Sequence, residues 1–151
     1  SPVNAYLNLI GIETLGLRME RECQNALELA HWIAENYSDI IVNYPGLEES
    51  PYHEIAKKQF RNGYGAIVTV RTGSKEKAFS IINSLKIPLI ISNIGDTKTL
   101  VIHPESTIAA HISDEEKLQS GVFEDLIRIS VGIEDIEDLK EDFKQAIENN
   151  R

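Results

Sequence analysis

Arg128 is the residue of this 151-residue chain that first points to chemistry, because it interrupts the apolar run Leu126-Ile127-Arg128-Ile129-Ser130-Val131. A guanidinium between two isoleucines must direct its charge somewhere, and its planar fork matches a carboxylate or a phosphate. An ion pair with one of the chain's own acids, or a side chain that reaches solvent, would explain the residue without any binding role. The residues alone leave all three interpretations open.

Two further apolar segments, 88–91 and 100–102, end in polar turns. The hydrogen-bonding or turn-forming residues of these turns are Ser92, Asn93, Gly95, Glu105 and Ser106. If the segments form neighbouring strands, the amide of Asn93 and the guanidinium of Arg128 could converge on one carboxylate at an edge of the sheet. Taken by itself, this pattern supports no more than a module that binds an acid.

Other kinds of site are not indicated by the sequence. The four histidines are scattered without the paired spacing that zinc requires, so we expect no metal site. Cys23 is the single cysteine and falls on an apolar helical stripe, where a thiol is usually inert packing, and it excludes an internal disulfide. The glycines form no phosphate-binding loop between a strand and a helix.

The charge composition restricts the kinds of partner that the chain can bind. Twenty-four acidic and fifteen basic side chains give a formal net charge of −9, which argues against nucleic acid or an anionic membrane. No apolar run is long enough for a membrane span and no export signal is present, so we expect a cytoplasmic protein. The chain opens on Ser1-Pro2 rather than on methionine, which suggests a fragment or a processed chain.

The expected helices and strands follow from the spacing of the apolar residues and from the turn-forming residues between them. Helical spacing predicts leading helices within 1–36, and alternating or apolar runs predict four or five strands in a sheet-and-helix part over 37–151. The order predicts an α/β (α+β) fold, a single domain with a small mixed or mainly antiparallel sheet and its helices largely on one face. One apolar stripe is predicted to be core along its whole length: Leu15, Met19, Cys23, Ala26, Leu27, Ala30 and Ile33.

Three segments, in their order and spacing, resemble the C-terminal domain of the Cys/Met-metabolism pyridoxal-phosphate enzymes, the cystathionine γ-synthase group. They are Gly63-Tyr-Gly-Ala-Ile-Val, Ser92-Asn-Ile-Gly-Asp-Thr-Lys-Thr-Leu-Val-Ile-His-Pro and Asp125-Leu-Ile-Arg-Ile-Ser-Val-Gly-Ile-Glu-Asp. The resemblance implies the C-terminal domain of a fold-type I enzyme. The Asn-Ile-Gly-Asp loop and Tyr44-Pro-Gly-Leu are most similar to the O-acetylhomoserine sulfhydrylases within that group.

The resemblance also assigns roles. It implies that Arg128 grips the substrate α-carboxylate with help from Asn93, and that Ser92, Gly95, Glu105 and Ser106 line the site. Pyridoxal 5'-phosphate and the catalytic residues would belong to a larger domain that precedes this chain, so the chain alone would be inactive. The implied partners are O-acetylhomoserine or a related amino acid, a thiol, and further copies in a homo-oligomer, most simply a tetramer.

Some residues depart from the family pattern. Glu105 replaces an alanine, Ile108 and Ala109 replace a Thr-His pair, and Glu22 stands where a histidine is common. Glu105 is therefore expected to place a negative charge near the carboxylate site. A methionine γ-lyase domain, a cystathionine γ-synthase domain and a stand-alone regulatory module that senses an amino acid remain alternatives.

Overall fold

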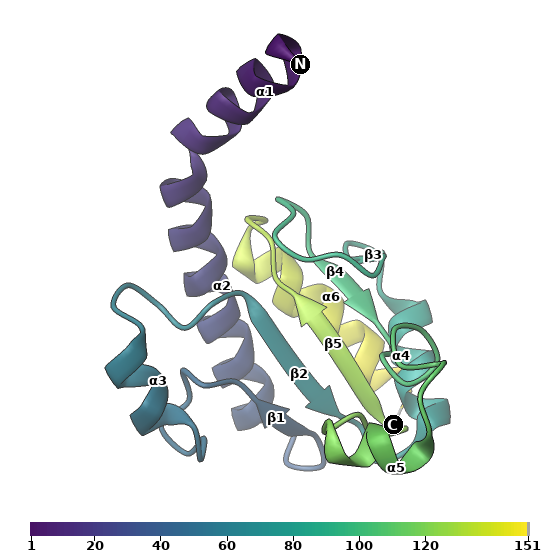
Figure 1. Ribbon diagram of the computed structural model, residues 1–151. Coiled ribbons are helices and arrows are strands. Elements are labelled where there is room, and N and C mark those ends of the chain that lie inside the picture. The colour runs from purple at the N-terminus through teal and green to yellow at the C-terminus, as the bar shows by residue number, and fades with distance from the viewer. Residues whose placement is uncertain (151) are drawn as a thin grey trace.

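The computed structural model describes residues 1–150, and it contains six helices and five strands in the order that the sequence predicts (Figure 1). Each expected element is present, so the predicted fold class is confirmed. The elements are α1 (Pro2–Glu13), α2 (Leu15–Asn36), β1 (Ile41–Asn43), α3 (His53–Gln59), β2 (Ile67–Arg71), α4 (Lys75–Ser84), β3 (Leu89–Ile90), β4 (Leu100–Ile102), α5 (Asp114–Gln119), β5 (Leu126–Ser130) and α6 (Ile136–Glu148).

The five strands form one mixed sheet in the order β1-β2-β5-β4-β3. The β3–β4 pair is parallel and the other three pairs are antiparallel. β5 is the central strand, and the residue at its middle, Arg128, lies opposite Thr69 of β2 and Ile102 of β4. The sheet thus agrees with the prediction of four or five mainly antiparallel strands.

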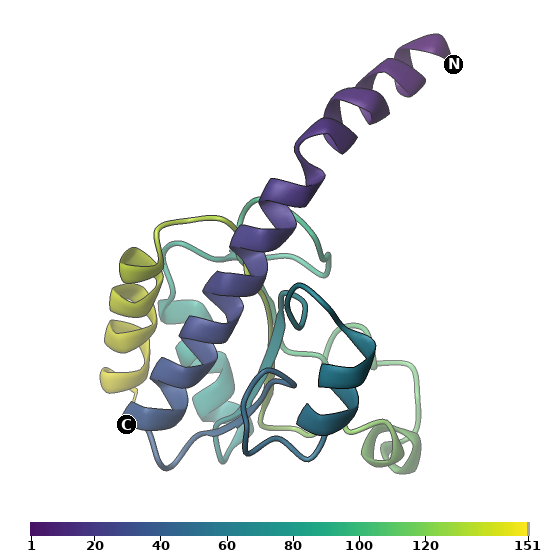
Figure 2. The same ribbon diagram turned by 90° about the vertical axis from the view of Figure 1, so that its left-hand side faces the viewer.

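The helices α2, α4 and α6 cover one face of this sheet (Figure 2). Side chains of β2 and β5 alternate between faces, so Val68, Val70, Ile127 and Ile129 are buried in the core that these helices cover. Local signals begin the helices where the sequence indicates. The Asp135 side chain accepts from the backbone N–H of Glu137 at the start of α6, for example.

The predicted apolar stripe on α2 is core only in its C-terminal half, so that part of the prediction is wrong. Leu15 is 43% exposed and Met19 is 36% exposed, whereas Leu29, which the stripe omits, is fully buried. The reason is geometric, because the first turns of α2 rise beyond the sheet (Figure 1).

α4 shows a smaller deviation of the same kind. Helical spacing places Phe79 on the apolar face of α4, but it is 36% exposed and packs on the imidazole of His103 with ring centroids 4.6 Å apart. Ile81 takes the core position instead. The aromatic ring therefore covers the segment after β4 rather than the sheet.

α1 projects away from the body of the protein (Figure 1). No residue of α1 is buried, although most of its side chains are apolar and surround the helix on every side. The exposed apolar residues of α1 are Val3, Tyr6, Leu7, Leu9, Ile10 and Ile12. A helix that is apolar all round is normally enclosed by protein, and residues 1–150 leave α1 uncovered.

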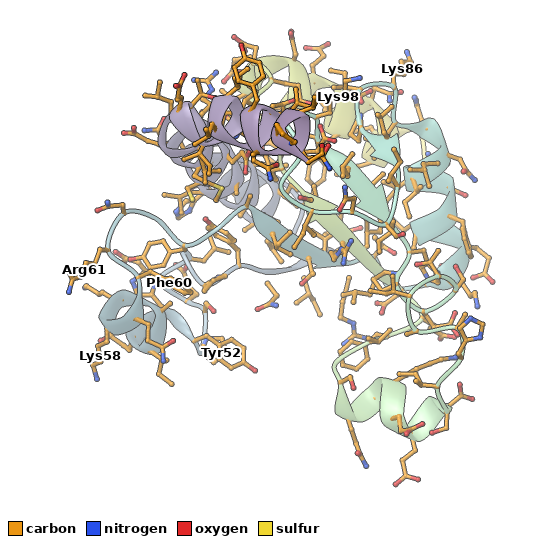
Figure 3. All side chains as sticks on the ribbon, turned by 45° about the horizontal axis from the view of Figure 1, so that its top comes forward. Tyr52, Lys58, Phe60, Arg61, Lys86 and Lys98 are labelled. Carbon is orange, nitrogen blue, oxygen red and sulfur yellow. The ribbon has the colours of Figure 1, made fainter. Side chains whose placement is uncertain are left out.

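The segment around α3 is a polar surface excursion. Tyr52 and Phe60 are largely exposed, and Figure 3 shows them with Arg61 around α3, away from the sheet. This part of the chain contributes little to the core.

A close approach at Gly132 joins the end of β5 to the start of β4. A Cβ atom at this position would lie 2.4 Å from the Thr97 carbonyl oxygen. On the other side, the Asn25 side chain donates to the carbonyl oxygens of Gly132 and Glu134, each at 2.9 Å. Only glycine leaves room for the backbone to pass between these groups.

We expect the 151-residue chain to self-associate through α1 when it is purified alone, because burying the apolar side chains of α1 removes them from water. Sedimentation velocity should show a concentration-dependent oligomer. A variant with Leu7, Ile10 and Leu9 changed to glutamine should sediment as a monomer. A clean monomer of the unaltered chain at high concentration would contradict the expectation.

We expect Gly132→Ala to lower the free energy of unfolding by about 2 kcal/mol or more, because the added methyl overlaps a backbone oxygen that cannot move independently. Urea unfolding followed by circular dichroism measures the change. The matched control is Gly16→Ala in α2, which has no atom within 4 Å of its added Cβ. That change should raise stability by about 0.5 kcal/mol through helix propensity.

Candidate functional site

Arg128 lies on the sheet face opposite the three packed helices. Its neighbours Ile127 and Ile129 are fully buried on the helix side, so strand alternation directs Arg128 to the other face together with Ser130. The side chain is half-buried there. The strand therefore fixes where the guanidinium emerges.

The hydrogen bonding of Arg128 leaves much of its capacity unused. Nη2 donates to the backbone carbonyl of Asn93 at 3.2 Å, and Nε is buried without an acceptor. No carboxylate of residues 1–150 forms an ion pair with it. Burial lowers the pKa of the guanidinium, which is the cost of enclosing a cation without an anion. This geometry favours an external anion over the internal ion pair.

The loop over Arg128 comes from the turn after β3. Ser92, Asn93 and Gly95 are all exposed in it, and Gly95 has a positive φ of 71°. The backbone N–H of Gly95 donates to the hydroxyl of Ser130 at 3.3 Å. The structure thus places Asn93 and, through Ser130, Gly95 beside Arg128, with Ser92 in the same loop.

The far end of the same loop is fastened to the turn after β5. Ile133 N–H donates to the Thr97 carbonyl at 2.9 Å. The Glu134 carboxylate accepts from the backbone N–H of Thr99 at 2.6 Å and from its hydroxyl at 2.8 Å. These bonds tie the loop 92–98 to the segment 130–134 at both of its ends.

Glu105 belongs to a different cluster. It pairs with Lys75 of α4 at 2.7 Å and with Lys117 of α5 at 2.8 Å. The hydrogen bonds from the two lysines, that from Lys117 being the stronger influence, lower the pKa of Glu105 to about 2. Its charge is therefore neutralised by partners on two helices.

Glu105 also lines a cavity of about 410 Å³ together with Arg71, Lys117 and Asp125. Neither Arg128 nor Asn93 lines that cavity. The expectation that Glu105 places a negative charge near the carboxylate site therefore receives no support from the geometry.

Ser106 is held near the same cluster by His103. Its hydroxyl lies 2.8 Å from Nδ1 of His103, while Nε2 lies 2.7 Å from the carbonyl oxygen of Glu124. A carbonyl only accepts, so Nε2 carries the proton and Nδ1 accepts from Ser106. The two hydrogen bonds make His103 a structural link between the end of β4 and the start of β5.

Three residues of this region were not predicted for the site: Ser130 and Thr69, which lie near Arg128 on β5 and β2, and Glu134, which fastens the loop through Thr99. The alternation of β5 would have placed Ser130 on the face of Arg128. Thr69 and Glu134 depend on strand order and on a turn between distant segments, for which a single sequence gives no signal.

The family model for Cys/Met metabolism PLP-dependent enzymes matches residues 1–148. The chain belongs to this family. Among its members, O-acetyl-L-homoserine sulfhydrylase 1 of Thermus thermophilus is 45% identical over 97% of this chain, which corresponds to 35% of that protein. This chain therefore spans about a third of the length of that relative.

Two solved structures of the Cys/Met metabolism family support the same fold. A putative O-acetylhomoserine (thiol)-lyase from Campylobacter jejuni is 39% identical with a TM-score of 0.93, covering 98% of this chain and 35% of that one. That protein carries a pyridoxyl-lysine phosphate. Yeast cystathionine gamma-lyase is 36% identical with a TM-score of 0.92, covering 98% of this chain and 38% of its own. The shared fold thus accompanies more than one reaction.

The cofactor of the Cys/Met metabolism family is pyridoxal phosphate, which enzymes attach through a lysine. Four of the nine lysines here are half-buried, and each of these is paired with a carboxylate. The other five are exposed, and Figure 3 shows Lys58 and Lys86 pointing outward. No lysine of residues 1–150 therefore offers an enclosed, unpaired amine for the cofactor.

The part of the chain that the structure describes holds no group of three histidine, cysteine or acidic side chains close enough to bind a metal ion. None of its helices is both long and apolar enough to cross a membrane.

We expect Glu105→Gln to lower the free energy of unfolding by about 1 kcal/mol at neutral pH, an estimate reduced for the partial exposure of Lys75. The pKa of Glu105 is lowered on folding, so its contribution is present above the unfolded pKa and is lost as the pH falls toward 2. Urea unfolding at several pH values should show the two proteins converge in acid. Glu49→Gln, at an exposed position, should leave stability unchanged.

Proposed function

We propose that this chain is the substrate-binding part of a pyridoxal-phosphate-dependent O-acetylhomoserine sulfhydrylase, in which Arg128 binds the α-carboxylate of the amino acid. The observation that carries the proposal is the guanidinium on the sheet face opposite the helices, half-buried and without a carboxylate among residues 1–150. The relatives support the reaction class. The chemistry of an amino-acid carboxylate supports the ligand, because it matches the fork of arginine in shape and charge.

The Asn93 carbonyl contributes by holding one nitrogen of the guanidinium in place. This bond limits the rotation of Arg128 before the substrate arrives, so less entropy is lost on binding. Asn93 also has an exposed side-chain amide that is available to the same carboxylate. The two residues form an orienting clamp for the carboxylate end of the substrate.

A clamp of this kind matters because pyridoxal phosphate, when bound, withdraws electrons only from the Cα bond that stands perpendicular to its ring. Arg128 decides this orientation by fixing the carboxylate. The cofactor and the catalytic groups lie in the remainder of a longer protein, and the chain alone is inactive. The exposed apolar surface of α1 fits a further domain that encloses it.

The reaction that we propose replaces the acetoxy group of O-acetylhomoserine with sulfur. Sulfide gives homocysteine and acetate, and methanethiol gives methionine and acetate. The intact protein would act as a cytoplasmic homo-oligomer, most simply a tetramer. An assay of the full-length enzyme with O-acetylhomoserine plus sulfide, compared with methionine alone or with cysteine as the thiol, separates this reaction from methionine γ-lyase and cystathionine γ-synthase.

An amino-acid-sensing module that functions on its own is the second candidate, because the unpaired Arg128 would serve a sensor equally well. The reading frame of the gene that encodes this chain distinguishes the enzyme domain from the stand-alone module. About 250 preceding residues with a phosphate-binding loop and a lysine at a strand end support the enzyme. A reading frame that starts at Ser1 would support the module.

We expect Arg128→Ala in the full-length enzyme to raise the KM for the amino-acid substrate on the order of 100-fold, because a charged hydrogen-bonding partner is lost. The absorbance of the bound cofactor should not change. Steady-state kinetics and an absorbance spectrum measure the two quantities.

Arg61→Ala is the matched control, since Figure 3 places Arg61 beside α3 on the surface excursion. It should leave the KM unchanged. Arg128→Lys, which keeps the charge without the fork, should fall between the two. A KM for Arg128→Ala that equals the wild-type value would refute the clamp.

A further inference from the structure

Glu22 is a buried acid that belongs neither to the Arg128 site nor to the Glu105 cluster. It lies on α2 and is 1% exposed, and neither of its carboxylate oxygens has a hydrogen-bond partner within residues 1–150. Among these residues, buried side-chain polar atoms without partners occur only in Glu22 and Arg128. A native protein seldom leaves a carboxylate in this condition without a reason.

The charged groups that face Glu22 are one base and two acids. Arg18 lies one turn before it on α2, Asp96 comes from the loop after β3, and Glu134 comes from the turn after β5. The Arg18 guanidinium is used elsewhere, since it donates to the Gly11 carbonyl at 2.7 Å and to the Thr14 hydroxyl at 3.4 Å. It therefore attracts Glu22 without hydrogen-bonding to it.

The two neighbouring acids have donors of their own, unlike Glu22. Asp96 accepts from the backbone N–H of Lys98 at 3.0 Å, and Glu134 accepts from Thr99. An ionised Glu22 would then add a third negative charge to a region that offers it no hydrogen bond.

Both of these acids belong to the segments that support Arg128. Asp96 is part of the loop whose Asn93 carbonyl accepts from Arg128. Glu134 anchors the end of that loop through Thr99, and Asn25, one turn after Glu22, holds the Glu134 carbonyl. Repulsion between an ionised Glu22 and these two acids would therefore act on the hydrogen bonds that hold the loop 92–98.

We propose that Glu22 is a positioning residue: protonated, it allows the loop 92–98 to dock against α2 and segment 130–134, and ionised, it loosens this loop and weakens carboxylate binding at Arg128. The proposal rests on the proposed function of Arg128. It gives the site a dependence on pH that originates outside the substrate contacts.

The direction of the effect follows from burial. Desolvation raises the pKa of the Glu22 carboxyl, Arg18 opposes the rise, and Asp96 and Glu134 add to it. The acid is thus protonated over a wider range of pH than an exposed glutamate. Raising the pH through its titration removes the proton and introduces the repulsion.

The test uses the full-length holoenzyme and its Glu22→Gln variant, which keeps the shape of a protonated carboxyl without the charge. Between about pH 5 and about pH 9, the wild-type KM for the amino acid should rise about tenfold beyond that of the variant, in the range typical of coupled sites. The kcat profiles of the two proteins should coincide. Glu20→Gln, an exposed position on the same helix, should behave as wild type.

Hydrogen exchange of the peptide that contains residues 92–99 provides a readout that needs no activity. It should quicken with pH in the wild type, after correction for the intrinsic rate, and remain slow in Glu22→Gln. If the full-length protein has no sulfhydrylase activity but the exchange difference between wild type and Glu22→Gln is present, only the proposed function is refuted. Identical exchange and identical KM profiles in the wild type and Glu22→Gln would overturn the role of Glu22.

Discussion

Alternation along one central strand is the constraint on which the structure depends. β5 pairs with β2 on one side and β4 on the other, and its isoleucines are buried under the helix layer. Because successive side chains leave a strand on opposite faces, burial of Ile127 and Ile129 leaves Arg128 no route except the open face. The hydrophobic core and the position of Arg128 are therefore set by the same register, and a slip of one residue would exchange the two faces.

Buried charges near the start and near the middle of this strand are paired differently. Near its start, Glu105 is enclosed by two lysines, an arrangement that offsets the cost of burial. Near its middle, Arg128 is enclosed without an anion. The contrast separates a charge that is paired within residues 1–150 from one that is available to the proposed ligand. The unpartnered Glu22 is influenced by Asp96 of the same loop whose Asn93 carbonyl accepts from Arg128, so the two incompletely satisfied groups are linked through one loop.

Local signals account for what could be predicted. Periodicity gave the elements, and caps such as Asp135 gave a helix start, because these patterns depend on neighbouring residues. The exposed first turns of α2 were missed, since periodicity reports which face is apolar but not whether anything covers it. The partners of Glu105 come from residues 30 and 12 positions away, and pairing over such separations depends on topology. The role of Arg128 was predicted mostly from the family resemblance. Only the structure shows that it has no carboxylate partner among residues 1–150.

The strand order also governs how the domain can be assembled during synthesis. β5 is the last strand to be made, yet it is the only strand that joins the β1–β2 pair to the β3–β4 pair. Until it emerges, the two halves of the sheet have no hydrogen-bonded connection, and each exposes an unpaired edge that invites association with other chains. Completion of the fold and arrival of Arg128 thus occur in one step, so a nascent chain gains the proposed carboxylate clamp only when its sheet closes.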